Sequence, residues 1–216
     1  MASSRTSKVG DTKKPAVKVR DYRLYELERI AADALRDAER CLKGRRLDIE
    51  RLILEKFKLK IETFVDLRRR WDTYAFIDTT GAVIFIDADL MNETRLEKKY
   101  RFTLAEELAH FLIHRHLFAD CRTIEARMKI EEMLDERTRA YMESNAKALA
   151  SAILMPKATV EPLVESLAGK LVDGEGHILV DQLVSALVGE YDVNFQAAKR
   201  RMINLGYRQR LNLDLQ

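Results

Sequence analysis

Two glutamates and two histidines stand close together in residues 101–114, and their spacing suits metal chemistry. Residues four apart on an α-helix share one face, so Glu106 and His110 can hold one ion between them. Glu107 lies beside that face, where a carboxylate can take a proton from a metal-bound water. The segment differs by one residue from H-E-x-x-H, a pattern that binds zinc on a helix, because Glu106 stands at the position of the first histidine.

The apolar residues of the same segment predict a helix that is largely buried. They recur at helical spacing and comprise Phe102, Leu104, Leu108, Phe111 and Leu112. Charged side chains on a buried helix need a metal or counter-ions, since an unpaired buried charge is costly. The competing interpretation is a solvated amphipathic helix on which Glu106 and Glu107 face water.

A second helix is predicted at residues 143–156, and it brings a third carboxylate, Glu143. Its content of Ala, Leu and Ile is typical of a core helix, and Pro156 marks its end. Glu143 is therefore a further candidate partner for the polar side chains of the first helix.

Together the two segments resemble the ImmA/IrrE-type metallopeptidases. The usual pattern of that family is close to R-F-T-L-A-H-E-L-G-H-x-x-x-H followed by E-x-x-A-N-x-F-A-A-x-L-L-M-P. Residues 101–114 match the first part of this pattern except at Glu106 and Ala109. Residues 143–156 follow the second part and depart from it at Lys147, Leu149 and Ser151.

The resemblance implies an α+β, zincin-like fold over residues 45–210, with a small, mostly antiparallel sheet packed on helices that include the active-site helix. It implies that zinc-activated water hydrolyses a peptide bond, and that the substrate is a regulatory protein such as a helix-turn-helix repressor. Carried over by position, His110 and Glu143 are metal ligands, Glu107 is the catalytic base and Glu106 is an atypical ligand.

Three interpretations of Glu106 stay open. A carboxylate can bind zinc, so Glu106, His110 and Glu143 would leave a fourth position for water. Alternatively, His110 and His114, also four apart, form the histidine pair with Glu143 as the third ligand. In the third interpretation metal binding and hydrolysis are lost, and a pseudoenzyme regulates by binding a partner protein. A di-iron site built on Glu107-x-x-His110 is not expected, because neither of the other histidines has a glutamate three residues before it.

Periodicity predicts the elements that must position these residues. Helices are expected at residues 22–43 and 47–57, and strands at 58–65, 74–77 and 82–86. Asp78-Thr-Thr-Gly81 is a turn signal, so the last two strands form a hairpin, and an edge strand of this sheet can align an extended substrate. The charged residues 118–139 are expected to be an exposed linker or helix start that returns the chain so that Glu143 can face His110, without a catalytic role.

The C-terminal part predicts two helices, residues 180–191 and 195–205, with Gly206 at the second C-terminus. Such a pair could be a helix-turn-helix that presents Lys199, Arg200 and Arg201 to DNA. A net charge of +3 is a weak electrostatic footprint, so nucleic-acid binding is not expected.

Composition is that of a globular protein, with 216 residues, 47% apolar and 34% charged. No apolar run could span a bilayer and no secretory signal is recognised, so a cytoplasmic location is expected. Cys41 and Cys121 form no C-x-x-C pair and are expected to be structural thiols. The expected organisation is a basic tail, an N-terminal helix, a zincin-like domain and a C-terminal helical unit, at residues 1–20, 21–44, 45–156 and 157–216.

Overall fold

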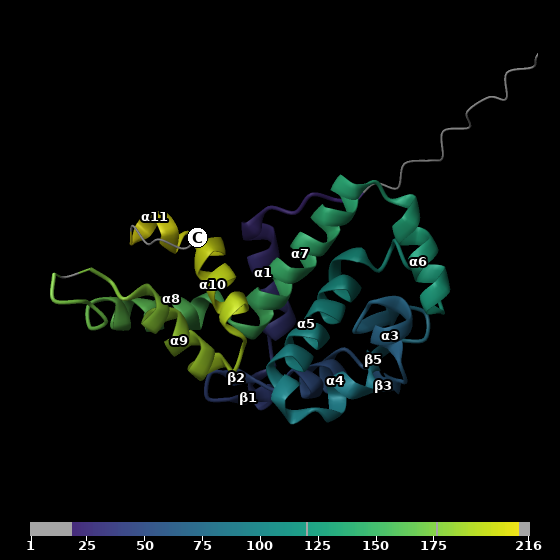
Figure 1. Ribbon diagram of the computed structural model, residues 1–216, viewed down its shortest axis with the longest axis horizontal. Coiled ribbons are helices and arrows are strands. Elements are labelled where there is room, and N and C mark those ends of the chain that lie inside the picture. Colours follow the sequence, from purple (N-terminus) through teal and green to yellow (C-terminus); the bar gives the residue numbers. More distant parts are fainter. Residues whose placement is uncertain (1–18, 120, 176, 212–216) are drawn as a thin grey trace, which may run out of the picture.

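The computed structural model describes residues 19–119, 121–175 and 177–211, and the predicted basic tail lies almost entirely outside this range. Two long helices, α5 (Glu97–His114) and α7 (Glu136–Leu154), pack against each other at the centre, with a small sheet beside α5 (Figure 1). This arrangement confirms the α+β prediction and shows why the two motif segments meet. None of the helices in the described ranges is long and apolar enough to cross a membrane.

The remaining helices surround this central pair. They are α1 (Leu24–Leu35), α2 (Ile49–Arg51), α3 (Leu67–Trp71), α4 (Ala88–Asn92), α6 (Ile124–Met133), α8 (Lys157–Ala168), α9 (Val180–Tyr191), α10 (Phe195–Asn204) and α11 (Tyr207–Arg210). Single turns of 3-10 helix at Glu39–Cys41 and Thr94–Leu96, and of π-helix at Leu52–Lys56, connect some of them.

The sheet has the strand order β3 (Lys60–Phe64), β5 (Val83–Asp87), β4 (Ala75–Asp78). The predicted hairpin is confirmed, since β4 and β5 are antiparallel. Asp78 accepts hydrogen bonds from the backbone N–H groups of Thr80 and Gly81 at 2.8 and 2.9 Å. A side chain at Gly81 would meet the Asp78 carboxylate and displace it from these hydrogen bonds, so glycine suits this position. β3 and β5 are parallel, which makes the sheet mixed and leaves β4 at an edge.

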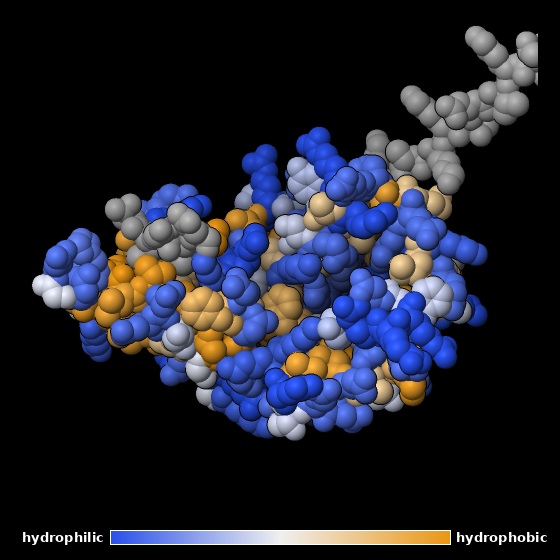
Figure 2. All heavy atoms as spheres, in the orientation of Figure 1, coloured by the Kyte–Doolittle hydropathy of each residue, from blue (hydrophilic) through white to orange (hydrophobic). Residues whose placement is uncertain are grey.

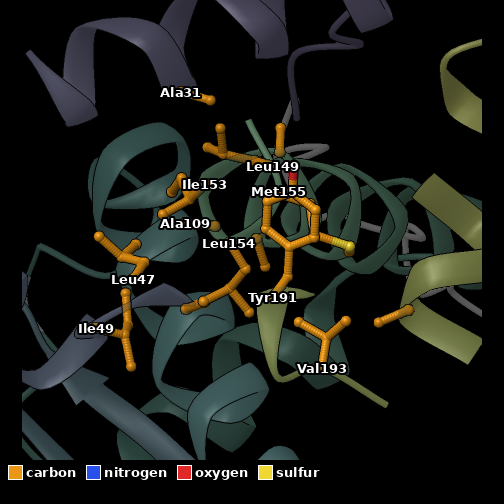
Figure 3. Packing of buried hydrophobic residues seen from close by; sticks show 14 of the residues in the cluster. Ala31, Leu47, Ile49, Ala109, Leu149, Ile153, Leu154, Met155, Tyr191 and Val193 are labelled. Atoms are coloured by element: carbon orange, nitrogen blue, oxygen red, sulfur yellow. The ribbon is translucent and has the colours of Figure 1, made fainter. Parts of the chain in front are cut away.

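The core lies between α5, α7 and the C-terminal helices. Ala109 and Leu149 are fully buried where α5 contacts α7, and the small Ala109 side chain allows the two helices to approach closely. Figure 3 shows this packing, with Ala109 near Ile153 and Leu154. The opposite faces of the same two helices are therefore left to form a cleft.

The bounds predicted for the two N-terminal helices are wrong. The helix expected at residues 22–43 ends at Leu35, because Asp37 adopts a positive φ of 57° that an α-helix cannot continue through. A short hairpin of β1 (Leu42–Lys43) and β2 (Arg46–Leu47) follows, turned at Gly44 with a φ of 63°. The helix expected at 47–57 is divided into α2 and the π-helical turn that follows it.

The C-terminal helices agree closely with expectation, but one of their basic residues does not face solvent. Arg201 is fully buried, donates to the Met155 carbonyl at 2.8 Å and pairs with Glu28 of α1 at 2.9 Å. A buried arginine that binds a carbonyl and a carboxylate holds helices together and cannot contact DNA. Arg201 therefore does not belong to a DNA-binding surface, contrary to the helix-turn-helix interpretation.

Candidate functional site

A cleft of about 840 Å³ lies over the face of α5 that carries the first motif. One wall is residues 71–75, from the end of α3 into β4, and the others come from α6, α7 and the start of α10. The cleft opens on the face drawn in Figure 2, where the hydrophilic surface is hollowed between α7 and α3. Of the bordering elements, β4, α7 and α10 are predicted from the sequence, whereas α3 is not.

Three polar side chains of the α5 motif, those of Glu106, Glu107 and His110, line the cleft, and His114 contacts His110. Glu107, His110 and His114 are buried, and Glu106 is partly buried, with 18% of its side chain exposed. Glu143 of α7 faces them, and its Oε1 lies 3.6 Å from Nε2 of His110. The structure thus brings together all the residues that the two motifs predict for the site.

Glu107, the expected catalytic base, is held by an arginine. Arg127 of α6 lies 3.2 Å from the Glu107 carboxylate and 2.8 Å from Glu131, and its guanidinium stacks 4.7 Å from the ring centre of Phe118. Both members of the Glu107–Arg127 pair are buried. Residues 118–139 include a helix, α6, as one of the two predicted alternatives has it, but the prediction that the segment is exposed is wrong at Arg127, which is buried and supplies a cation to the site.

The two histidines form a coupled pair. Nδ1 of His110 and Nδ1 of His114 are 3.1 Å apart, so one ring donates to the other. Burial lowers the pKa of His110 well below its ordinary value and that of His114 to about 4, so both rings are neutral. Nε2 of His114 has no hydrogen-bond partner among the described residues.

This pairing allows two arrangements of the ring protons. When His114 donates through Nδ1, His110 carries its proton on Nε2, which faces Oε1 of Glu143 at 3.6 Å. In the reverse arrangement Nε2 of His110 is free to bind a metal, but His114 then buries an N–H group without an acceptor. The first arrangement is favoured, because it turns an N–H toward a carboxylate and leaves neither ring with a buried, unpaired N–H.

Glu106 faces a cation of the second motif. Nζ of Lys147 lies 3.8 Å from Oε1 of Glu106. Burial raises the pKa of Glu106 to about 8, and Lys147 opposes this effect. Burial also raises the pKa of Glu107 to about 7, against the effect of Arg127, and it raises the pKa of Glu143. Three carboxyl groups are thus crowded in a region of low polarity.

A zinc site needs three protein ligands that converge on one point and an open position for water. His110 and Glu143 converge, but Glu106 pairs with Lys147 instead. Within residues 19–119, 121–175 and 177–211, no three His, Cys, Asp or Glu side chains are arranged to hold a metal ion. The residues as they are placed, with two cations among them, do not fit a three-ligand zinc site.

The rim of the cleft carries an aromatic residue between two cations. Tyr74, just before β4, has Nζ of Lys99 3.3 Å from its ring centre and the guanidinium of Arg68 5.1 Å away. These two cations lower the pKa of the Tyr74 hydroxyl. Because β4 pairs with β5 on one side only, its first residue Ala75 borders the cleft at an edge strand.

A motif helix crossed by a second helix that brings a glutamate, beside the edge of a small sheet, defines the class of zincin-like metallopeptidases. Residues 49–202 match the family model of Peptidase_M78, described as the IrrE N-terminal-like domain. The match covers well over half of the chain, so the protein belongs to this metallopeptidase family, whose members use a metal, typically zinc. A search of curated proteins found no match.

Two functional residues escape the sequence analysis. Arg127 has a weak signal, since it precedes Glu131 by four residues on a helix, but nothing in the sequence links it to Glu107. Lys147 is recognised as a departure from the family pattern, and its contact with Glu106 is not foreseen. The roles of Glu106, His110, Glu143, Glu107 and the alternative ligand His114 in metal chemistry remain predictions.

Proposed function

We propose that this protein uses the cleft of a metallopeptidase to bind an extended segment of a cytoplasmic regulatory protein, and that it does so without hydrolysing a peptide bond. The observation that carries the proposal is the buried Glu107–Arg127 pair, 3.2 Å apart. A general base accepts a proton from water most readily when no fixed cation compensates its negative charge. The charge of Glu107 is compensated by the buried Arg127, whose Nη1 contacts Oε2 of the carboxylate.

The shape of the cleft supports binding of an extended segment. The edge strand β4 borders it and can form main-chain hydrogen bonds with a peptide. Trp71 and Tyr74 line the same wall and offer apolar surface to side chains of the ligand. The family resemblance adds that the partner is a transcriptional regulator such as a helix-turn-helix repressor.

The second candidate function is the metal-dependent peptidase that the family name implies. The observation in its favour is the 3.6 Å separation of His110 and Glu143, which is close to the spacing of two ligands of one ion. For this function, Glu106 or His114 would have to turn toward them as the third ligand, and Glu107 would have to act as the base through Oε1, the oxygen that does not contact Arg127.

The two candidates are separated by one titration, for which Trp71 is the probe because it is the only tryptophan in the sequence and lines the cleft. Short unstructured peptides selected on the immobilised protein are titrated while tryptophan emission is recorded. We expect a saturable change in emission, absent in Trp71→Phe, and intact peptides by mass spectrometry after incubation with Zn²⁺.

Two outcomes contradict the proposal. The first is a selection that yields no peptide with saturable binding. The second is cleavage of a bound peptide with Zn²⁺ that is lost in Glu107→Gln and kept in Glu132→Gln, a matched change at an exposed position of α6. That result would favour the peptidase.

A further inference from the structure

The cleft contains two cations opposite its carboxyl groups, and each lies on a different helix. Lys147 of α7 is 3.8 Å from Glu106, and Arg127 of α6 is 3.2 Å from Glu107. We propose that these two side chains take over the charge compensation that a metal ion would provide, and that Lys147 excludes a divalent cation from the site. This inference rests on the proposed metal-free function.

The charges explain why two cations are needed. Glu106, Glu107 and Glu143 crowd together in and around the buried face of α5, and partly buried carboxylates need positive charge nearby. A zinc ion would bring two positive charges. Lys147 and Arg127 together bring the same number, and they are covalently part of the fold.

The two departures from the family pattern compensate each other. Glu106 stands in place of a histidine and adds one carboxyl group to the site, and Lys147 stands in place of an asparagine and adds one ammonium group. The side chains lie on different helices, yet they are in contact. A site that loses its metal ion needs another positive charge beside its carboxyl groups, and Lys147 supplies one at its contact with Glu106.

The geometry also indicates how Lys147 would act on an ion. It lies four residues after Glu143 on α7, so both side chains leave the helix on the same side. An ion held by Glu143 and His110 would lie near the ammonium group, which is directed at Glu106. Like charges repel, so Lys147 opposes metal binding, although solvent screens part of this repulsion because its side chain is half-exposed.

Arg127 has a different role in this charge compensation. It is buried and binds two carboxylates, whereas the side chain of Lys147 is 56% exposed. Arg127 is therefore part of the packed structure around Glu107. Lys147 is the residue whose removal can restore metal binding without unfolding the cleft.

The test measures zinc content and affinity in the native protein and in Glu106→His, Lys147→Asn and the double variant. Elemental analysis gives the zinc per chain, and competition with a chelating dye gives the affinity. We expect no zinc in the native protein, weak binding in Glu106→His and one zinc per chain in the double variant. The double variant should bind zinc about tenfold or more tightly than Glu106→His, because one repelling charge is gone.

Three controls isolate the charge of Lys147. Glu106→His with Lys147→Arg keeps the positive charge and should bind zinc as weakly as Glu106→His alone. Glu106→His with Lys170→Asn makes the same change at an exposed lysine after α8 and should also behave like the single variant. Where circular dichroism shows that the Asn double variant does not fold, Glu106→His with Lys147→Gln replaces it. Added zinc should raise the melting temperature of each variant that binds it.

The outcomes separate this inference from the proposed function. One zinc per chain in the native protein would overturn both. Equal zinc affinity in Glu106→His and the double variant, with none in the native protein, would overturn the role of Lys147 and leave the metal-free function standing. A folded double variant that binds no zinc would have the same consequence.

Discussion

The core face and the cleft face of α5 and α7 depart from the family pattern in different ways. On the core face, Ala109 and Leu149 replace a glycine and a phenylalanine, and both are fully buried without any change of charge. On the cleft face, Glu106 and Lys147 each change the charge of the site. The first kind of departure preserves the packing of the two helices, and the second alters what the cleft can do.

This difference teaches that fold and chemistry are specified by separate sides of the same helices. Side chains on the core face must fill volume, so apolar exchanges are tolerated there. Side chains on the cleft face must balance charge, so a change at Glu106 requires another at a residue that touches it. The following variants test whether the two faces are as independent as this suggests.

The largest effect is expected at the buried ion pair of the cleft. Arg127→Gln leaves Glu107 buried without its cation and should lower the free energy of unfolding by about 3–5 kcal/mol. Urea unfolding followed by circular dichroism measures the change. Arg122→Gln, at an exposed position before α6, is the control and should stay within about 0.5 kcal/mol of the native protein. A loss below 1 kcal/mol for Arg127→Gln, on the order of a surface pair, would show that the cleft does not depend on this cation.

The next largest effect is expected for Glu106→Gln, which should change how the free energy of unfolding depends on pH. Because burial raises the pKa of Glu106 in the folded protein to about 8, the folded state holds this proton more tightly than the unfolded chain, and stability falls as pH rises from about 4.5 to 8. Glu106→Gln removes this loss and should stabilise the protein by about 2–4 kcal/mol at alkaline pH. The gain should vanish at acidic pH. Unfolding curves at both extremes measure it, and a gain independent of pH would contradict the assignment.

The core face is tested by overpacking. Ala109→Leu forces a larger side chain into the contact between α5 and α7 and should cost about 1–3 kcal/mol. Thermal melts measure the change, with Ala140→Leu at an exposed position of α7 as the control. If the faces are independent, Ala109→Leu should leave peptide binding by the folded protein unchanged when it is monitored through Trp71.

The smallest effect is expected for Lys147→Asn in the absence of metal. The side chain is 56% exposed, so solvent screens its pair with Glu106, and its loss should change the free energy of unfolding by less than about 1 kcal/mol. Urea unfolding with a chelator present measures this. A loss as large as that of Arg127→Gln would mean that Lys147 is needed for folding rather than for exclusion of an ion.

Much of the fold is predictable from local signals in the sequence. The bounds of α9 are as predicted, the hairpin of β4 and β5 follows from the turn that ends at Gly81, and both motif helices are present. The parallel pairing of β3 with β5 is not predictable in this way, because it joins strands that are separated by a helix and a third strand. The early end of α1 at Leu35 also escapes, since Asp37 adopts a backbone conformation that its residue type only weakly favours.

By itself, the sequence determined the family, the helices that carry the motifs and the four polar residues of those motifs that line the cleft, Glu106, Glu107, His110 and Glu143. Helical periodicity and turn residues are local properties of the chain, so they can be recognised in the sequence without knowledge of the fold. Only the tertiary structure decided the partner of each charge. Arg127 reaches Glu107 from another helix, Lys147 reaches Glu106 across the cleft, and Arg201 is buried against Glu28. Such pairs depend on how distant segments pack. The strength of each electrostatic interaction, and the pKa of each group, depend on the burial that this packing creates.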